Sequence, residues 1–124
     1  MRQQCFELTN QYRARVGVPP VVRRTDKEPC SDAEAESDGR SGKAHGAFGK
    51  CGQGAQNECP GYDASAPERS LAGCLEQMFR EGPGEPYSEH GHYLNMTKAG
   101  YRGVACGFAV NPKGQLWITQ NFFP

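Results

Sequence analysis

The chain has 124 residues, of which 36% are hydrophobic, and its 14 basic and 14 acidic side chains balance. This length fits a single domain, residues 1–124, with one modest core. A neutral chain lacks the net basic surface that nucleic-acid binding requires, and no apolar run is long enough to span a membrane. The sequence therefore excludes both of these function classes.

Six cysteines stand at scattered positions without any Cys-x-x-Cys spacing: Cys5, Cys30, Cys51, Cys59, Cys74 and Cys106. This pattern disfavours a zinc ribbon and predicts three disulfides formed in an oxidising compartment, so we expect a secreted or periplasmic protein. The N-terminal residues contain no apolar signal core, as is typical of a mature chain. Six cysteines allow fifteen pairings. The one that we expect is Cys51–Cys59, a local bridge around a glycine-rich loop.

Helical signals occupy the first third of the chain. Residues 3–16 predict a helix that Gly17 ends, because side chains recur on one face at Cys5, Leu8, Tyr12 and Val16. A second helix is predicted to start with Ser31 as its cap and Glu34 three residues later. Its small side chains and two glycines make it a weak helix. From residue 48 to 64 glycine and proline dominate, which predicts a loop with at most short extended pieces.

The clearest helix signal covers residues 65–81. Ser65 and Glu68 have the spacing of a capping box, and an apolar stripe runs through Leu71, Cys74, Leu75, Met78 and Phe79. After a loop, residues 92–98 predict a short helix. The chain then ends in a hairpin, residues 103–110 and 115–123, with Trp117 and Phe122 in its core. Helices followed by a hairpin predict an α+β domain, in which helices cover a small antiparallel sheet.

Glu81 is the first candidate for a functional role. It lies seven residues after Cys74, so helical geometry places it on the apolar stripe, about 20° from that cysteine. In the last turn of a helix its charge also opposes the macrodipole, at about 0.3–1 kcal/mol. A carboxylate at the border of a buried face is unfavourable, so its presence there indicates a functional role. The alternative to a functional role is fraying of the helix end into solvent.

Two histidines beside glycines complete a candidate site. His45 precedes Gly46 and His92 follows Gly91, and glycine neighbours allow a close approach to a shared cavity. Imidazole and carboxylate groups together suit either proton transfer or a divalent cation such as zinc, with His45 and His92 as the metal ligands. The spacing is not His-Glu-x-x-His, so no local motif specifies a metal.

Four segments resemble the CAP superfamily of cysteine-rich secretory, antigen 5 and pathogenesis-related 1 proteins, also called the SCP domain. Residues 8–21 resemble its opening helix, residues 44–58 its histidine segment running into a Gly-Glu-Asn signature, and residues 78–81 its Trp-x-x-Glu helix, with Met78 in place of the tryptophan. Residues 91–110 resemble its Gly-His-Tyr signature, the most specific of the four. The motifs follow the family order over nearly the whole chain. The resemblance implies a disulfide-stabilised α-β-α sandwich.

The resemblance also implies a tetrad of two histidines and two glutamates in a central cleft. Its motifs assign three of these positions to His45, Glu81 and His92, whereas His90 has no counterpart and is interpreted as a loop residue. At the fourth position Ala-Gln-Asn aligns with Gly-Glu-Asn and places Gln56, which can hydrogen-bond but is neither a base nor an anion. Glu58 is the alternative, because residues two apart on an extended segment face the same way.

Three functions are consistent with these residues. The first is a secreted binding module whose cleft takes an unknown ligand or protein partner, with the tetrad as a structural or divalent-metal centre. The second is a metal-assisted or acid–base hydrolase using His45, His92 and Glu81, which the missing charge at Gln56 disfavours. The third is a small disulfide-rich interaction protein or toxin without a working cleft. We expect the first of these functions, carried out by a monomer, and enzymatic activity is the less expected alternative.

Overall fold

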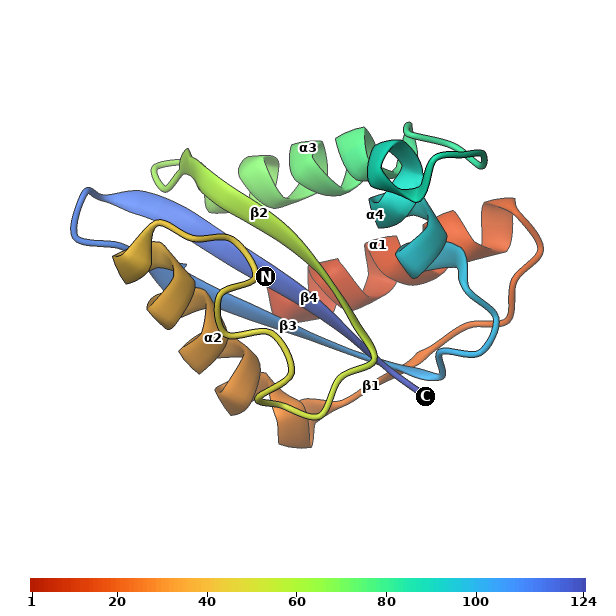
Figure 1. Ribbon diagram of the computed structural model, residues 1–124, viewed down its shortest axis with the longest axis horizontal. Helices are drawn as coiled ribbons and strands as arrows, with labels where there is room; N and C mark the ends of the chain where they lie inside the picture. The colour runs from red at the N-terminus through yellow and green to blue at the C-terminus, as the bar shows by residue number, and fades with distance from the viewer.

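The computed structural model describes residues 1–124 as three layers, in which helices cover both faces of one sheet (Figure 1). The strands are β1 (Val22–Arg23), β2 (Ala55–Asp63), β3 (Gly103–Val110) and β4 (Gln115–Phe123), in the order β1-β3-β4-β2. The three long strands are antiparallel, and only the short β1 pairs in parallel, with β3. The predicted α+β sandwich is confirmed. Since β2 pairs only with β4, its other edge is open.

Helix α2 (Glu28–Ser41), preceded by the 3-10 turn η1 (Thr25–Lys27), lies on one face of the sheet. Helices α1 (Arg2–Arg15), α3 (Pro67–Phe79) and α4 (Tyr87–Thr97) cover the other face (Figure 1). The main apolar cluster lies on the three-helix side and includes Leu71, Leu75, Met96, Ile118 and Phe122. None of the helices combines the length and the apolar character needed to cross a membrane.

Strand β4 is buried from Leu116 to Phe123 because both of its faces are covered. Leu116, Ile118 and Phe122 join the apolar cluster, as predicted for Phe122, and Trp117 is buried as predicted. On the face toward α2, Thr119 and Asn121 instead make hydrogen bonds to Ser31. The two faces of the sheet therefore differ, since the main apolar cluster lies on the three-helix side, whereas on the α2 side buried polar side chains alternate along β4 with Trp117 and Phe123.

Three disulfides tie three helices to the rest of the fold: Cys5–Cys106 joins α1 to β3, Cys30–Cys51 joins α2 to the loop after it, and Cys59–Cys74 joins β2 to α3. No cysteine is free, as predicted. The expected Cys51–Cys59 bridge is wrong. Cys59 points from β2 toward α3, whereas Cys51 lies in the loop that packs against α2, on the other side of the sheet.

The first helix and the terminal hairpin are confirmed, although Val16 lies past the end of α1 and is exposed. The main error concerns β2, a nine-residue strand within the segment that was predicted to be a loop. Pairing with β4 outweighs the local preference of its residues. Pro60 and Gly61 fall at a register shift between Cys59 and Tyr62, where an irregularity in the strand tolerates them.

Helix α2 begins at Glu28, before Ser31, so Ser31 and Glu34 are not a capping pair. Both are buried on the face of α2 toward the sheet. The helix also continues through Gly39, whose small size leaves room for Trp117. The local Ser-x-x-Glu pattern was therefore misleading, because it marks two inward positions one turn apart.

The starts of the last two helices also differ from the predictions. Helix α3 has no side-chain cap, because Ser65 donates its hydroxyl to Asp63 instead. Helix α4 starts at Tyr87, well before His92. His90 therefore lies on a helix, and its interpretation as a loop residue was wrong.

Gly107 determines how closely α2 approaches the sheet. A Cβ atom at this position would overlap the backbone carbonyl group of Ser31, which cannot rotate away. At Gly103, by contrast, the added atom would meet the flexible side chain of Arg24 at 2.7 Å. We expect Gly107→Ala to lower the free energy of unfolding by at least about 3 kcal/mol and Gly103→Ala by less than about 1.5 kcal/mol. Urea denaturation measures both, and equal losses would contradict this packing.

Candidate functional site

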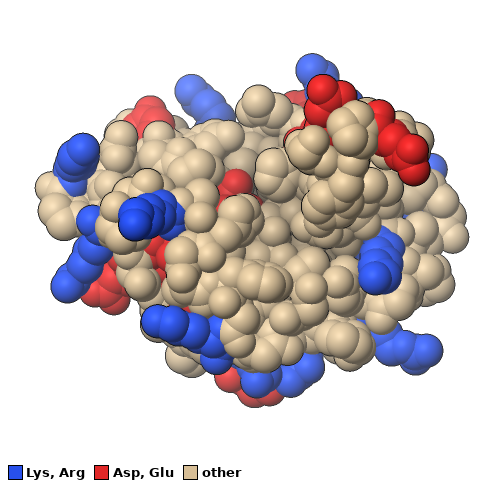
Figure 2. Space-filling model, viewed as in Figure 1, with Lys and Arg blue, Asp and Glu red and all other residues tan.

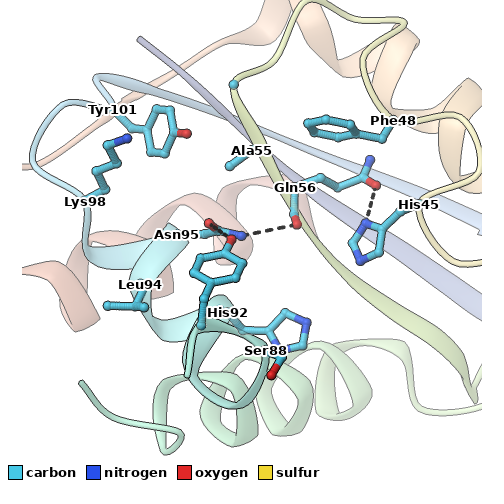
Figure 3. Close-up of a pocket in the computed structure, with 13 residues that line it drawn as sticks. His45, Phe48, Ala55, Gln56, Ser88, His92, Leu94, Asn95, Lys98 and Tyr101 are labelled. Atoms are coloured by element: carbon cyan, nitrogen blue, oxygen red, sulfur yellow. Dashed lines mark hydrogen bonds between the residues drawn. The ribbon is translucent and has the colours of Figure 1, made fainter. Parts of the chain in front are cut away.

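A pocket of about 520 Å³ lies at the open edge of β2, between α4 and the loop that follows α2 (Figure 3). His45 from the loop, Gln56 from β2 and His92 from α4 all line it. Its apolar and aromatic lining is formed by Phe48, Ala55, Tyr87, Leu94 and Tyr101. No aspartate or glutamate lines it. The fold thus brings the two predicted histidines to one pocket from distant parts of the chain.

Glu81 holds His92 from behind the pocket. Its Oε2 lies 2.6 Å from His92 Nδ1, and its Oε1 accepts hydrogen bonds from the backbone N–H groups of His92 at 3.0 Å and Tyr93 at 3.3 Å. Glu81 follows the end of α3 and is half-buried, so it is not in the last helical turn as predicted. Because a carboxylate only accepts, Nδ1 carries the proton and Nε2 is the nitrogen left for the pocket.

Gln56 holds His45 in a similar way. Its Oε1 lies 2.8 Å from His45 Nδ1, whereas its Nε2 donates to Glu34 Oε1 at 3.1 Å and to Asn121 Oδ1 at 2.9 Å. Both amide hydrogens are used on the protein side, so the amide oxygen faces His45 and accepts from Nδ1–H. Nε2 of His45 is therefore also left for the pocket.

The two imidazoles together define what the site can do. Neither Nε2 atom has a hydrogen-bond partner within the protein. A neutral imidazole nitrogen of this kind accepts an N–H or O–H group, takes up a proton or binds a cation. Nowhere in the chain do three or more His, Cys, Asp or Glu side chains come close enough to hold a metal ion.

Glu58 lies beneath the His45 loop and does not line the pocket. It shares a face of β2 with Gln56, as strand alternation requires, and it is only 4% exposed. Its Oε1 accepts the backbone N–H of His45 at 2.6 Å and lies 3.8 Å from Nδ1 of the ring. Of the two residues considered for the fourth tetrad position, Gln56 contacts the imidazole and Glu58 supports the backbone.

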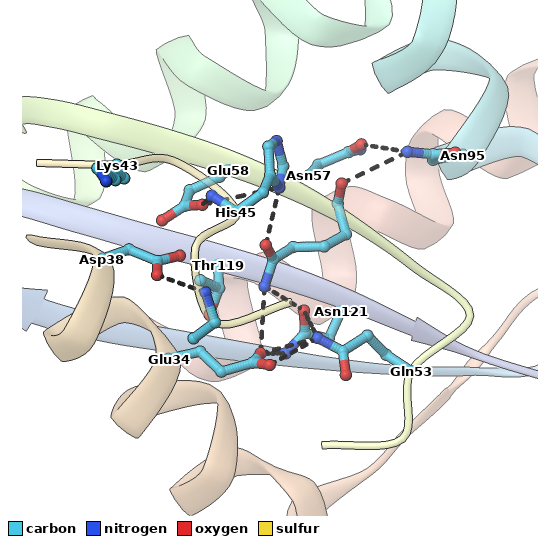
Figure 4. A network of polar contacts seen from close by, with 12 residues as sticks. Glu34, Asp38, Lys43, His45, Gln53, Asn57, Glu58, Asn95, Thr119 and Asn121 are labelled. Carbon is cyan, nitrogen blue, oxygen red and sulfur yellow. Dashed lines mark hydrogen bonds and ion pairs between the residues drawn. The ribbon is translucent and has the colours of Figure 1, made fainter. Parts of the chain in front are cut away.

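Asp38 supports the same loop by accepting the backbone N–H of Ala47 at 2.9 Å (Figure 4). Between these two anchors His45 adopts a φ of 62°, which is unusual for a residue other than glycine and persists only where the surroundings enforce it. Burial raises the pKa of Glu58 to about 8, and the neighbouring Asp38 adds to the rise. At neutral pH Glu58 thus keeps a proton that it can share with Asp38.

His90, the third histidine, does not line the pocket. Its Nδ1 lies 2.7 Å from the carbonyl oxygen of Glu81 and 2.8 Å from that of Gly82, so the ring donates to the turn after α3. His90 therefore braces the turn that carries Glu81.

Sequence reasoning missed a polar layer between α2 and the sheet. It is formed by Glu34, Asp38, Gln53, Thr119 and Asn121 (Figure 4), together with Ser31, which contacts Thr119 and Asn121. One signal was present. Ser31, Glu34 and Asp38 recur at spacings of three and four residues, which places polar groups on one stripe of a helix. A polar stripe on a helix with few apolar residues indicates a polar buried face.

The raised pKa of Glu58 makes stability depend on pH in a defined direction. Between about pH 4.5 and 8 the unfolded chain releases this proton while the folded chain keeps it, so stability falls as pH rises. We expect wild-type protein to lose roughly 2–4 kcal/mol of unfolding free energy from pH 5 to pH 8 through this group. Glu58→Gln should abolish that loss, because an amide still accepts from His45 and donates to Asp38.

Denaturant unfolding at several pH values measures this difference. Glu76→Gln is the matched control, because Glu76 is exposed and pairs only with Arg80 on the surface of α3. Parallel pH profiles for wild type and Glu58→Gln would contradict the assignment.

Comparison with solved structures supports the fold. BmVAL-1 is 15% identical with a TM-score of 0.72, and the match covers 99% of this chain and 76% of that one. An extracellular SCP-domain protein from Bacillus anthracis is 15% identical with a TM-score of 0.65, covering 99% of this chain and 40% of that one. Venom allergen-like protein 4 from Schistosoma mansoni is 13% identical with a TM-score of 0.57, covering 98% and 87%.

Comparison with curated protein sequences gives no match. At identities this low the solved structures establish the fold alone, and this chain spans less than half of the Bacillus anthracis protein. The family comparison is more direct, because the model of the cysteine-rich secretory protein family, CAP, matches residues 6–122. The match includes both histidines, Gln56 and Glu81, together with all strands of the sheet except the last residue of β4. The chain therefore belongs to the cysteine-rich secretory protein family, as its motifs had indicated.

Proposed function

We propose that the protein is an extracellular binding module of the CAP family that holds a small ligand in the pocket between His45 and His92. One observation carries the proposal: two imidazole Nε2 atoms open on the same pocket, and each ring is already fixed through its Nδ1. The volume of about 520 Å³ is in the range of small-molecule sites. Three disulfides support an extracellular location.

The lining of the pocket favours a ligand with a negative group. Lys98 is its one permanently charged residue, and its Nζ lies 5.3 Å from the centre of the Tyr101 ring. Figure 2 shows that charged side chains lie mostly around the rim of the face seen in Figure 1. An anionic group beside Lys98 would gain a charge-assisted hydrogen bond without meeting a carboxylate.

The remaining walls favour a ligand with an apolar body. Phe48 is 47% exposed and Tyr87 is 59% exposed, and both border the pocket with Leu94 between α4 and the sheet edge. An apolar ring or chain would cover these surfaces. The ligand is therefore a compact molecule with an apolar body, an N–H or O–H donor for the histidines, and an anionic end.

Anilinonaphthalene sulfonate combines these three features and serves as a probe. We expect it to bind with one-to-one saturation, and Lys98→Gln to weaken binding by roughly 5- to 30-fold through loss of the charged contact. Lys113→Gln, in the turn between β3 and β4, removes the same charge far from the pocket and should leave binding unchanged. Fluorescence titration measures all three proteins. Equal affinities for the two lysine variants would contradict the proposal.

A divalent cation is a second candidate occupant, because neither Nε2 atom has a partner in the protein. The donor set fits zinc in part: His45 and His92 are suitable ligands, but Gln56 and Glu81 are engaged at the Nδ1 atoms and no third protein ligand is at hand. A bound zinc ion would lower the pKa of a coordinated water. A hydrolase stays the weaker hypothesis, since Glu81 is engaged with His92 Nδ1 and does not line the pocket, and Gln56 is neither a base nor an anion.

Calorimetric titration with zinc tests the second candidate. We expect weak binding at pH 7 that falls at least about tenfold by pH 5, because protonated imidazoles cannot bind a cation. His45→Ala and His92→Ala should each abolish uptake. Glu36→Ala is the control, since this exposed carboxylate pairs with Arg40, does not line the pocket and should leave uptake unchanged. Uptake that survives in His45→Ala and His92→Ala would exclude the pair as ligands.

A further inference from the structure

A buried carboxylate lies two hydrogen bonds away from His45. Glu34 on α2 is 2% exposed, and amide groups surround it (Figure 4). Its Oε1 accepts from Asn121 Nδ2 at 2.7 Å, from Gln53 Nε2 at 2.9 Å and from Gln56 Nε2 at 3.1 Å. Its Oε2 accepts from Gln53 Nε2 at 2.8 Å. No basic side chain is paired with Glu34, so these amides alone replace its hydration.

This arrangement removes a choice that amide side chains otherwise have. An amide can present either its oxygen or its nitrogen to a neighbour, but a carboxylate accepts only. Glu34 therefore draws the nitrogens of Gln56 and Asn121 toward itself. Asn121 consequently turns its Oδ1 to Gln56 and takes the second amide hydrogen, at 2.9 Å. With both hydrogens used, the oxygen of Gln56 must face the pocket.

We propose that Glu34 is a positioning residue for the pocket, which acts through Gln56 to keep His45 protonated at Nδ1 and unprotonated at Nε2. In His92 the Glu81 carboxylate fixes the same protonation pattern directly, because its Oε2 lies 2.6 Å from Nδ1 of the ring. Each histidine is thus fixed by one negative charge, and for His45 an amide stands between the charge and the ring. The proposal concerns the state of His45 itself and holds for any occupant of the pocket.

Exchanging the side chains of Glu34 and Gln56 tests whether these two positions together require one carboxylate and one amide. Gln56→Glu alone places a second carboxylate where Glu34 Oε1 and Asn121 Oδ1 require donors. We expect the unfolding equilibrium constant to rise roughly 10- to 100-fold. Glu34→Gln combined with Gln56→Glu should recover most of that loss, because the amide at position 34 then donates to the carboxylate at position 56.

Glu36 supplies the matched control for this exchange. It lies on the same helix but is exposed and pairs with Arg40. Glu36→Gln combined with Gln56→Glu removes the same charge and should recover nothing. Denaturant unfolding of the single and double variants gives the coupling. Additive effects, or equal recovery by the two double variants, would overturn the proposal.

Nitrogen-15 NMR of the imidazoles supplies a readout that a purely structural role would not change. We expect wild type and the exchanged variant to show His45 with only Nδ1 protonated. Glu34→Gln alone should add a population protonated at Nε2, because the Gln56 amide is then free to turn. His92 is the internal reference and should not change, since Glu81 is intact. An unchanged His45 spectrum in folded Glu34→Gln would overturn the proposal, and neither measurement requires a ligand.

Discussion

The burial of the Glu34 carboxylate is the constraint around which the α2 side of the molecule is organised. A carboxylate withdrawn from water is costly unless N–H donors replace its hydration. Gln53, Gln56 and Asn121 provide those donors. Because each of these amides points its nitrogen toward Glu34, its oxygen points away from Glu34 and accepts a hydrogen bond from another partner. One oxygen reaches His45, one faces Gln56, and the oxygen of Gln53 accepts the N–H of Cys51 in the loop.

The opposite wall of the pocket depends on a different buried charge. Arg13 on α1 has no acidic partner and donates to the carbonyl oxygens of Met96, Lys98 and Tyr101. Burial lowers the pKa of its guanidinium group. These carbonyls belong to the last turn of α4 and to the segment after it, which brings Lys98 and Tyr101 to the pocket. Glu34 on one side of the sheet and Arg13 on the other thus position the two walls of the pocket. Each of these side chains is hydrogen-bonded to neutral groups alone.

Local patterns predicted those elements whose stability is largely local. Helix α1, the body of α3 and the hairpin followed from periodicity, glycines and prolines. Strand β2 did not, because its pairing with β4 joins residues far apart in sequence. Ser31 and Glu34 were misread, since the start of a helix must be known before Ser-x-x-Glu can be interpreted. Family motifs located both histidines and Glu81, but the choice between Gln56 and Glu58 required three-dimensional contacts.

The open edge of β2 has a consequence for the behaviour of the molecule among other chains. An edge strand has unpaired backbone N–H and C=O groups that can pair with a strand of another chain, and native proteins cover or shorten such edges. At one border of this sheet the edge strand, β1, is only two residues long. At the other border the His45 loop and α4 flank β2, and Asn95 reaches the Gln56 carbonyl oxygen at 3.5 Å. The pocket lies between the His45 loop and α4, so a molecule bound there would also cover this part of the β2 edge and hinder its pairing with a strand of another chain.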